Sequence, residues 1–370
     1  MKNNTLFLTL RTFSATGGIE KVCKIVGKAL YEQSIVSATH TKVFSMYDKQ
    51  TDVDENVYFP SEMFRGFGQN KISFILSSVI KGRKADVVIL SHINLLLAGW
   101  LIKLISPSTK LVLFAHGIEI WGRLKSYQKW MLKSCDLIIP VSRFTADKIT
   151  DQQDFLKHKV GILNNCLDPF LQQGKEYIND NTLRVKYNFA SDDIVLMTLT
   201  RLSSKERYKG YDRVIQAIAV LKEKYPTIKY LLAGSYDNHE KQYLDKLITD
   251  CGVSDKVLFT GFIPEEELVS HFIMADLYVM PSIKEGFGIV FIEAMYYGLP
   301  VIAGNLDGSV DALANGRLGL LINPLNTSEI EMAIDKVLSD KVKYTPNREL
   351  LMESFGYDEY KRKLGDALAF

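Results

Sequence analysis

The sequence has few cysteines and no apolar run long enough to cross a membrane. Its four cysteines are scattered and form no Cys-x-x-Cys pair, which argues against a disulfide framework or a zinc site and fits a reducing compartment. The apolar run at 95–102 has eight residues and ends at Lys103, whereas a membrane-spanning helix needs about 20. The first residues do not resemble a signal peptide. We therefore expect a cytoplasmic protein, or one bound peripherally to the inner face of the cell membrane.

The content of apolar and charged residues is that of an ordinary globular protein. With 370 residues, the chain is long enough for about two domains. Hydrophobic residues make up 47% and charged residues 24%, which excludes a disordered chain. The net charge is only +2, but residues 60–134 hold 11 Lys and Arg against Glu62, Asp86 and Glu119. This asymmetry indicates either an anionic partner for the first half or a solvated basic face.

Short apolar runs alternate with segments of helical period along the chain. In the first half, buried parallel strands are expected at 5–10, 42–47, 85–92, 110–116, 136–142 and 159–164. A polar stretch at 164–188 is interpreted as a linker. The second half then predicts strands at 194–200, 228–233, 257–260, 277–280 and 300–303, and helices at 211–224, 240–251, 265–274 and 289–297.

This alternation predicts an α/β protein with two doubly wound, Rossmann-like domains that face each other across a cleft. The first domain is expected at 1–168 and the second at 169–354, followed by an amphipathic helix at 355–370. In such sheets, ligands bind beyond the carboxyl ends of the strands. We therefore look for functional residues at strand ends.

Two features of the first half lie at strand ends. Gly17-Gly18 opens the first helix, where glycine lets a ligand approach the backbone and the helix start favours an anion. The pair does not form the Gly-x-Gly-x-x-Gly fingerprint of dinucleotide binding. His116 ends the strand at 110–116 and is placed to hydrogen-bond a substrate hydroxyl or a carbonyl. The alternatives are a tight turn without a ligand and a structural histidine.

In the second half, four cations crowd the loop that leads into the helix at 211–224. Cations beside a helix N-terminus are unfavourable unless an anion balances them, and a diphosphate would supply that charge. The alternative is an exposed basic loop. The four cations are Arg201, Lys205, Arg207 and Lys209.

Two glutamates stand out in the segment 284–305. Glu285 precedes the turn Gly286-Phe287-Gly288, whose backbone N–H groups lead into a helix and can cradle a phosphate. Glu293 lies about one turn into that helix, in an apolar run where a buried carboxylate needs a partner. Glu293 is placed to accept hydrogen bonds from the vicinal hydroxyls of a ribose, or to pair with the backbone or an arginine.

Taken together, these residues resemble the retaining glycosyltransferases of family 4, which have the GT-B architecture. The resemblance covers nearly the whole chain. It is strongest at 199–324, where GFIPEEELVSHFIMADLYVMPSIKEGFG is followed by EAMYYGLPVIA. The residues that carry it are Glu285 and Glu293 with seven residues between them, Arg201, Lys209-Gly210, Gly17-Gly18 and His116.

The resemblance implies transfer of a sugar from a nucleotide-sugar donor with retention at the anomeric carbon. A UDP- or GDP-sugar is expected because these donors are common. Glu293 is expected to bind the donor ribose. Arg201 and Lys209 are expected to neutralise the diphosphate leaving group, and Glu285 and His116 to lie at the transferred sugar. The other implied donor contacts are backbone groups of Gly17, Gly18, Gly286, Phe287, Gly288, Ile289 and Val290, and a base site near Phe259 and Ile263.

Neither a metal nor another cofactor is expected, because fixed cations and a helix dipole can stabilise the leaving diphosphate and no Asp-x-Asp motif is present where a metal would be needed. The family favours same-face attack, in which the departing phosphate takes the acceptor proton, over a double displacement. The chain departs from the family pattern after Ala303. Asp307-Gly308 and Asp311 stand where many relatives have a glycine pair and a glutamate, and this leaves the donor sugar open.

The resemblance places the acceptor in the first domain and returns the C-terminal helix to it. Segments 64–84, 94–106 and 121–134 combine basic, apolar and aromatic side chains that suit an anionic membrane, although the run at 95–102 is expected in the core. A glycan or lipid-linked acceptor of bacterial surface polysaccharide is therefore expected, and no nucleic-acid partner. The alternatives are solvated helix faces for these segments and, for the chain, a GT-B sugar-nucleotide epimerase, a phosphorylase or a catalytically silent sugar-nucleotide-binding subunit.

Overall fold

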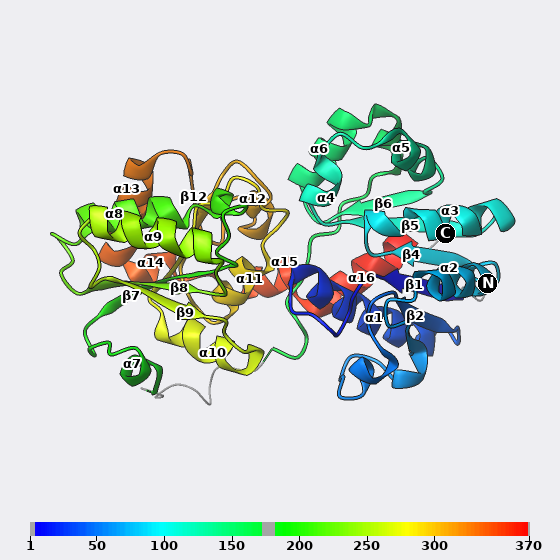
Figure 1. The fold of residues 1–370 in the computed structure, drawn as a ribbon, viewed down its shortest axis with the longest axis horizontal. Helices are drawn as coiled ribbons and strands as arrows, with labels where there is room; N and C mark the ends of the chain where they lie inside the picture. Colours follow the sequence, from blue (N-terminus) through cyan, green and yellow to red (C-terminus); the bar gives the residue numbers. More distant parts are fainter. Residues whose placement is uncertain (1–3, 172–181, 369–370) are drawn as a thin grey trace. The chain divides into compact units, whose positions relative to one another are not determined.

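A computed structural model describes residues 4–171 and 182–368 of the chain (Figure 1). The chain divides into two compact units: unit 1 is Met1–Pro169 with Tyr357–Phe370, and unit 2 is Phe170–Gly356. The sequence places these boundaries after residues 168 and 354. Residues 172–181 of the predicted linker and residues 369–370 of the predicted last helix lie outside the described residues.

Unit 1 is built on a six-stranded sheet in the order β3-β2-β1-β4-β5-β6, with every pairing parallel. The strands are short apolar runs because helices cover both faces of the sheet, as is usual for parallel sheets (Figure 1). The strands are β1 (Thr5–Thr9), β2 (Thr41–Ser45), β3 (Phe64–Gly66), β4 (Val87–Leu90), β5 (Lys110–Ala115) and β6 (Leu137–Pro140).

The helices of unit 1 form three groups. α3 contacts both α2 and α5, α4 contacts α6, and α16 contacts α1. Lys361 of α16 forms a 2.8 Å ion pair with Glu32 of α1, so the C-terminal helix is part of unit 1. The helices are α1 (Gly18–Val36), α2 (Lys71–Gly82), α3 (Leu96–Ile105), α4 (Ile118–Trp121), α5 (Ser126–Leu132), α6 (Arg143–Gln152) and α16 (Tyr357–Leu368).

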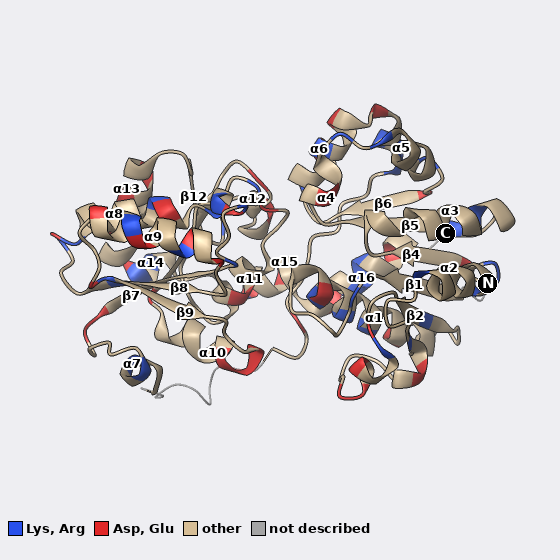
Figure 2. Cartoon of the chain, in the orientation of Figure 1, with Lys and Arg blue, Asp and Glu red and all other residues tan. Residues whose placement is uncertain are grey.

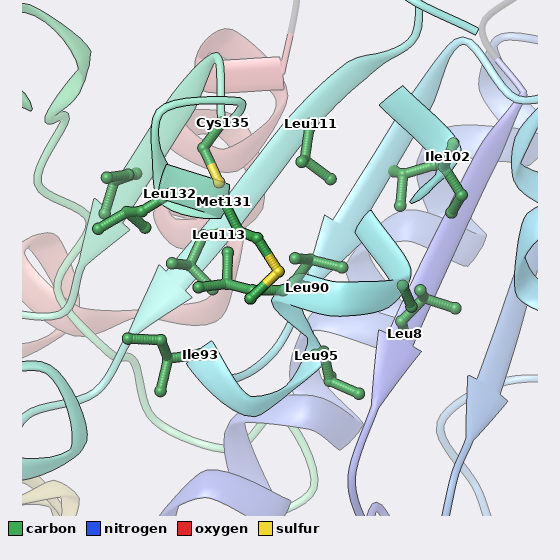
Figure 3. Close-up of a cluster of buried hydrophobic side chains, with 14 of the residues drawn as sticks. Leu8, Leu90, Ile93, Leu95, Ile102, Leu111, Leu113, Met131, Leu132 and Cys135 are labelled. Carbon is green, nitrogen blue, oxygen red and sulfur yellow. The ribbon is translucent and has the colours of Figure 1, made fainter. Parts of the chain in front are cut away.

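One hydrophobic core of unit 1 lies between the sheet and the helices α2, α3 and α5. Figure 3 shows Leu8 of β1 and Leu90 of β4 among side chains from these helices, including Ile102 and Met131. All four side chains are at most 7% exposed. This packing holds the strands in register, so that the residues after their carboxyl ends keep fixed positions.

The predicted strand at 159–164 is wrong. Asp154–Lys159 is a 3₁₀ helix, and Val160 forms only an isolated bridge with Ile138 of β6. Gly161 offers no side chain for packing, and Ile162 is 41% exposed, so this apolar run does not support a buried strand. The sequence analysis also missed β3, a three-residue edge strand too short to produce a clear pattern.

Unit 2 has a second six-stranded parallel sheet, in the order β12-β11-β10-β7-β8-β9. The strands are β7 (Ile194–Leu199), β8 (Ile228–Ala233), β9 (Val257–Gly261), β10 (Leu277–Met280), β11 (Val301–Gly304) and β12 (Leu320–Ile322). The helices are α7 (Thr182–Lys186), α8 (Tyr211–Leu221), α9 (Asn238–Asp250), α10 (Glu265–Met274), α11 (Ile289–Tyr296), α12 (Ser309–Ala312), α13 (Thr327–Ser339), α14 (Lys341–Tyr344) and α15 (Arg348–Phe355).

Most of the predicted elements of unit 2 are confirmed, and β8, β10 and α10 have the predicted bounds. The linker prediction is wrong at α7, which lies inside 164–188 and buries Leu183. Tyr187, just after α7, bonds to His271 of α10 at 2.8 Å between Oη and Nε2, so this segment packs onto unit 2. Among the described residues, no helix combines the length and the apolar character that a bilayer span requires.

Candidate active site

The glutamate motif of unit 2 lies where β10 ends and α11 begins. Glu285 is in the connecting loop and Glu293 is inside α11. Phe287 is 1% exposed and packs against Phe355 with 5.6 Å between ring centroids, so its side chain anchors the loop and only its backbone is open to a ligand. Gly288 has a φ of 84°, and a Cβ there would lie 2.5 Å from the ring of Phe291. This turn therefore requires glycine.

The start of α11 is suited to an anion. No described side chain caps this helix, and its first N–H groups, including those of Ile289 and Val290, have no acceptor within the helix. Together with the helix dipole, such groups favour a negatively charged ligand. The predicted phosphate cradle thus has the local geometry that it requires.

Asp307 fastens the loop that carries Glu285. Its side chain is 2% exposed. One carboxylate oxygen, Oδ2, accepts hydrogen bonds from Ser282 Oγ and Glu285 N, both at 2.7 Å, and Oδ1 accepts one from Ser309 N at 2.9 Å. Burial outweighs these bonds and raises the pKa of Asp307 to about 6. The departure from the family pattern at this position therefore acts on the Glu285 loop.

The second residue of the family's glycine pair is retained as Gly308. Its N–H donates to the carbonyl of Glu285 at 2.9 Å. A Cβ on Gly308 would overlap the carbonyl oxygen of Gly286, so a larger residue would push the two loops apart. Asp307 and Gly308 together hold the backbone of Glu285 through both its N–H and its carbonyl group.

The two predicted diphosphate ligands each have a carboxylate partner. Lys209 Nζ forms an ion pair with Glu285 Oε2, and both side chains are largely buried, at 13% and 17% exposed. Burial disfavours the charge on Lys209, but the carboxylate of Glu285 outweighs it and raises the pKa of Lys209. Arg201, whose side chain is 70% exposed, pairs with Glu206. The structure thus brings Lys209 and Glu285 together, with Arg201 on the same loop as Lys209.

The expectation that the four cations of this loop need an external anion is wrong for three of them, because carboxylates of the protein pair with Arg201, Arg207 and Lys209. Arg207, a predicted candidate to share the diphosphate role, bonds through Nε to Glu240 Oε2 at 2.8 Å and lies over the ring of Tyr243 at 3.7 Å. Glu240 is fully buried and also accepts from Tyr211 Oη at 2.9 Å. Arg207 therefore serves to neutralise a buried carboxylate between α8 and α9.

Glu293 is nearly buried, at 5% exposed, and already has an interaction within the protein. Burial raises the pKa of Tyr278 in β10, and the negative charges of Glu285 and Glu293 raise it further.

The predicted base segment follows β9. Phe259 lies within that strand, its ring covered by Lys241 Nζ at 4.3 Å and edge-on to Tyr236. Ile263 is 7% exposed, whereas Phe262 is 62% exposed. Phe262 is therefore the aromatic side chain of this segment that is open to a ligand, and the sequence analysis did not single it out.

In unit 1, a buried aspartate fastens the loop that leads to Gly17-Gly18. Asp48 is fully buried and follows β2. It accepts hydrogen bonds from Thr12 N at 2.7 Å and Ser14 N at 3.0 Å, and one from Ser45 Oγ at 2.7 Å. The sequence analysis missed Asp48. Both glycines are exposed and open α1, where the carboxylate of Glu20 already lies beside Gly17.

His116 directly follows β5 and is half-buried. Its Nε2 lies 2.8 Å from the carbonyl oxygen of Ser91, and Glu119 accepts from its backbone N–H at 2.6 Å. Burial lowers the pKa of His116, although the charge of Glu119 and the bond to Ser91 oppose the shift. Because a carbonyl only accepts, Nε2 carries the proton of the neutral ring, and Nδ1 is left as an acceptor for a hydroxyl group.

The described residues 4–171 and 182–368 contain no group of three or more His, Cys, Asp or Glu side chains that could hold a metal ion. Within unit 2, the predicted residues Lys209 and Glu285 meet directly. Within unit 1, Gly17-Gly18 and His116 follow the carboxyl ends of β1 and β5, at the same edge of the sheet.

Comparisons with known proteins match both units. The family model described as Glycosyltransferase Family 4 matches residues 16–169, and the model described as Glycosyl transferases group 1 matches residues 179–353. A GDP-mannose-dependent phosphatidylinositol monomannoside mannosyltransferase of Mycobacterium tuberculosis is 30% identical over 197 residues, half of each chain. An uncharacterised glycosyltransferase of Haemophilus influenzae is 25% identical over 95% of this chain and 96% of its own length.

The chain spans about half the length of the first curated relatives that it matches. Among solved structures, Anabaena HepE in complex with UDP superposes with a TM-score of 0.80 at 20% identity, over 100% of this chain and 99% of its own. That likeness confirms the predicted GT-B fold. The chain has two parallel sheets, and one family model matches each unit. The chain therefore belongs to the family 4, group 1 glycosyltransferases with the GT-B fold.

Proposed function

We propose that this glycosyltransferase moves a sugar from a UDP- or GDP-sugar to a glycan or lipid-linked acceptor, with retention at the anomeric carbon, in bacterial surface polysaccharide synthesis. The solved neighbour HepE is named as a complex with UDP, and the mycobacterial relative is named for GDP-mannose and a phosphatidylinositol acceptor. Both donors share a nucleoside diphosphate, which is the group that the residues of unit 2 suit.

The observation that carries the proposal is the braced pair of Lys209 and Glu285 beside the start of α11. A leaving nucleoside diphosphate develops negative charge, and a fixed cation with a helix N-terminus stabilises that charge. Because both are held in place before the donor arrives, little reorganisation is needed during the reaction. Glu285 keeps Lys209 charged and positioned, and its remaining carboxylate oxygen is available to a sugar hydroxyl.

The other predicted residues have distinct roles in donor binding. Arg201 is the more exposed cation and adds a forked contact to the diphosphate. Glu293 binds the ribose hydroxyls, and the base lies at the segment that contains Phe259 and Ile263. In unit 1, His116 Nδ1 accepts a hydrogen bond from a hydroxyl of the transferred sugar. The backbone at Gly17-Gly18 contacts phosphate or sugar oxygens.

For the chemical step we propose same-face attack. The bond between the anomeric carbon and the diphosphate oxygen breaks, and the bond to the acceptor oxygen forms on the same side of the sugar. The departing phosphate oxygen takes the proton of the acceptor hydroxyl, so neither a metal nor another cofactor has to supply a base. Lys209 and Arg201 compensate the charge that the diphosphate retains.

Binding of the donor is tested by thermal stabilisation. A ligand that binds only the folded state raises stability by RT ln(1+[L]/Kd), so UDP or GDP should raise the melting temperature. Glu293→Ala should abolish that rise, whereas Asp250→Asn, at an exposed site at the end of α9, should not. If UDP, GDP and their sugars all fail to stabilise the wild type, the donor site is refuted. NMR of the product's anomeric proton separates retention from inversion.

A further inference from the structure

The outer side of the helices α2, α3 and α5 in unit 1 exposes apolar side chains. On α2, Ile72, Leu76 and Ile80 recur every fourth residue and are 75%, 59% and 60% exposed. One side of α2 therefore faces solvent with an apolar stripe. We call the whole surface the α2/α3/α5 face, and its apolar members are Ile72, Leu76, Ile80, Leu97, Leu104, Ile105, Tyr127 and Trp130.

The three helices form one continuous surface. Gly82 of α2 lies against Ile102 of α3, where a Cβ would be 2.5 Å from the Ile102 side chain. Trp100 of α3 and Trp130 of α5 have ring centroids 4.6 Å apart. The expectation that the run at 95–102 lies in the core is confirmed for Leu95, Leu96, Ala98 and Ile102, whereas Leu97 is 45% exposed. The apolar residues of α3 serve the core on one side and this face on the other.

The charge of the face has a single sign. Residues 67–85, 93–109 and 120–135 contain nine Lys and Arg and no Asp or Glu, and blue segments mark α2, α3 and α5 in Figure 2. Within the described part of the chain, Lys71, Lys81, Arg83 and Lys84 are exposed and form no salt bridge. Lys103 is the member that is neutralised, by Asp136 at 2.7 Å.

This combination identifies the kind of partner. Two copies of this chain meeting through the face would bring cations against cations, which is unfavourable. An anionic lipid surface accepts the apolar side chains between its headgroups and attracts the lysines and arginines at the same time. Tryptophan and tyrosine are the aromatic residues that favour the boundary between water and lipid.

We propose that the α2/α3/α5 face docks on an anionic lipid bilayer. The proposal rests on the proposed function in one respect, since a lipid-linked acceptor would explain why the enzyme binds there. α2 and α5 begin at the edge of the sheet where the carboxyl ends of the strands lie. His116 comes directly after β5 and lies at the same edge. Ile72 and Tyr127 lie in the first turns of these helices, so docking brings the lipid surface next to the edge that carries the predicted sugar contact.

Vesicle co-sedimentation of the full chain tests the proposal. The wild type is expected to bind vesicles of mixed phosphatidylglycerol and phosphatidylcholine at low salt. It should bind vesicles of phosphatidylcholine alone much less, and bound protein should decrease as salt is added. Removing the apolar stripe (Ile72→Ser, Leu76→Ser and Ile80→Ser together) should weaken binding roughly tenfold or more. Removing three charges (Lys81→Ser, Arg83→Ser and Lys84→Ser) should weaken it on the order of 100-fold.

A matched control removes three exposed apolar residues of unit 1 that lie outside the face: Ile35, Val36 and Val57, at 61%, 88% and 62% exposed. Their replacement by serine should leave vesicle binding unchanged. UDP- or GDP-induced stabilisation is measured on every variant, and retained stabilisation shows that the variant is folded and that donor binding is independent of docking.

Three outcomes of the vesicle assay overturn the proposal: no binding of the wild type at low salt, equal loss of binding in the control, or face variants that bind like the wild type. Light scattering addresses a second copy as the partner. If the wild type is a dimer and the α2 variant is a monomer, the face is a contact between copies and the lipid proposal is wrong. Failure of nucleotide stabilisation with intact vesicle binding would refute the proposed function alone.

Discussion

Asp307→Asn tests whether the side chain that holds the Glu285 loop is a buried carboxylate that titrates. In the folded protein, burial raises the pKa of Asp307 to about 6, whereas an aspartate in an unfolded chain titrates near 3.9. The folded protein therefore holds this proton more tightly than the unfolded chain does. Asp307 contributes stability that is fully present below about pH 4 and is lost as the pH rises through about 6.

The magnitude follows from the two pKa values. A difference of about 2 units, at about 1.4 kcal/mol per unit, corresponds to roughly 3 kcal/mol. Asparagine does not titrate, so the variant lacks this component. The free energy of unfolding of the wild type minus that of the variant should be roughly 3 kcal/mol larger at pH 4 than at pH 7.5. Urea unfolding at several pH values measures it, with Asp250→Asn, exposed at the end of α9, as the control.

Activity gives a second, independent readout. The carboxylate accepts hydrogen bonds on both oxygens, but an asparagine side chain accepts only on one. Either Glu285 N or Ser309 N then loses its acceptor, and the Glu285 loop shifts relative to Lys209. A shift of about 1 Å in a reacting group can cost 10²-fold in rate, so turnover should fall roughly 10- to 100-fold with a smaller change in donor KM. A pH-independent stability difference refutes the burial argument, and unchanged turnover refutes the bracing role.

Three further predictions concern the charged residues of the site. Lys209→Ala and Arg201→Ala should each reduce the initial rate of sugar transfer by roughly 10²–10³-fold, as for other lost charge stabilisers, and wild-type rates would refute their roles. Arg207→Ala should lower the free energy of unfolding by about 2 kcal/mol. This is less than the loss of a fully buried ion pair, because Arg207 is 35% exposed. The donor KM should stay unchanged, and a raised KM would show that Arg207 contributes to donor binding. Because burial lowers the pKa of His116, its ring should stay neutral from pH 8 to the usual histidine value of about 6.5, and an NMR titration midpoint at or above that value would contradict this.

The fold was predictable because buried parallel strands have an unambiguous pattern. β10 is a continuous apolar run and β8 is apolar except for Lys229; glycine or proline follows each strand, at Gly234 and Pro281, and their bounds were predicted correctly. The pattern is misleading where burial is incomplete, as at 159–164. The pattern does not predict β3 or β12, because three residues in an edge strand are too few to show a periodicity.

Motif spacing predicted candidate residues, of which the structure brings Lys209 and Glu285 together, but it did not predict the ion pairs of the site. Counting cations at 201–209 suggested an unbalanced charge, because the partners of Arg207 and Lys209 are Glu240 and Glu285, far away in the sequence. No local pattern connects residues 33 or 76 positions apart. The sequence shows that Asp307 departs from the family pattern. It does not show that the Asp307 carboxylate accepts hydrogen bonds from backbone N–H groups.

Two of the buried aspartates, Asp48 and Asp307, follow one geometric rule. Asp48 lies three residues after β2 ends at Ser45 and holds the loop after the neighbouring strand β1. Asp307 lies three residues after β11 ends at Gly304 and holds the loop after the neighbouring strand β10. In parallel sheets, the carboxyl ends of adjacent strands lie side by side. A short acidic side chain in the loop after one strand can therefore accept hydrogen bonds from backbone N–H groups in the loop after the neighbouring strand. Asp48→Asn should therefore weaken donor binding through the loop before Gly17, and unchanged donor KM in that variant would limit the rule to unit 2.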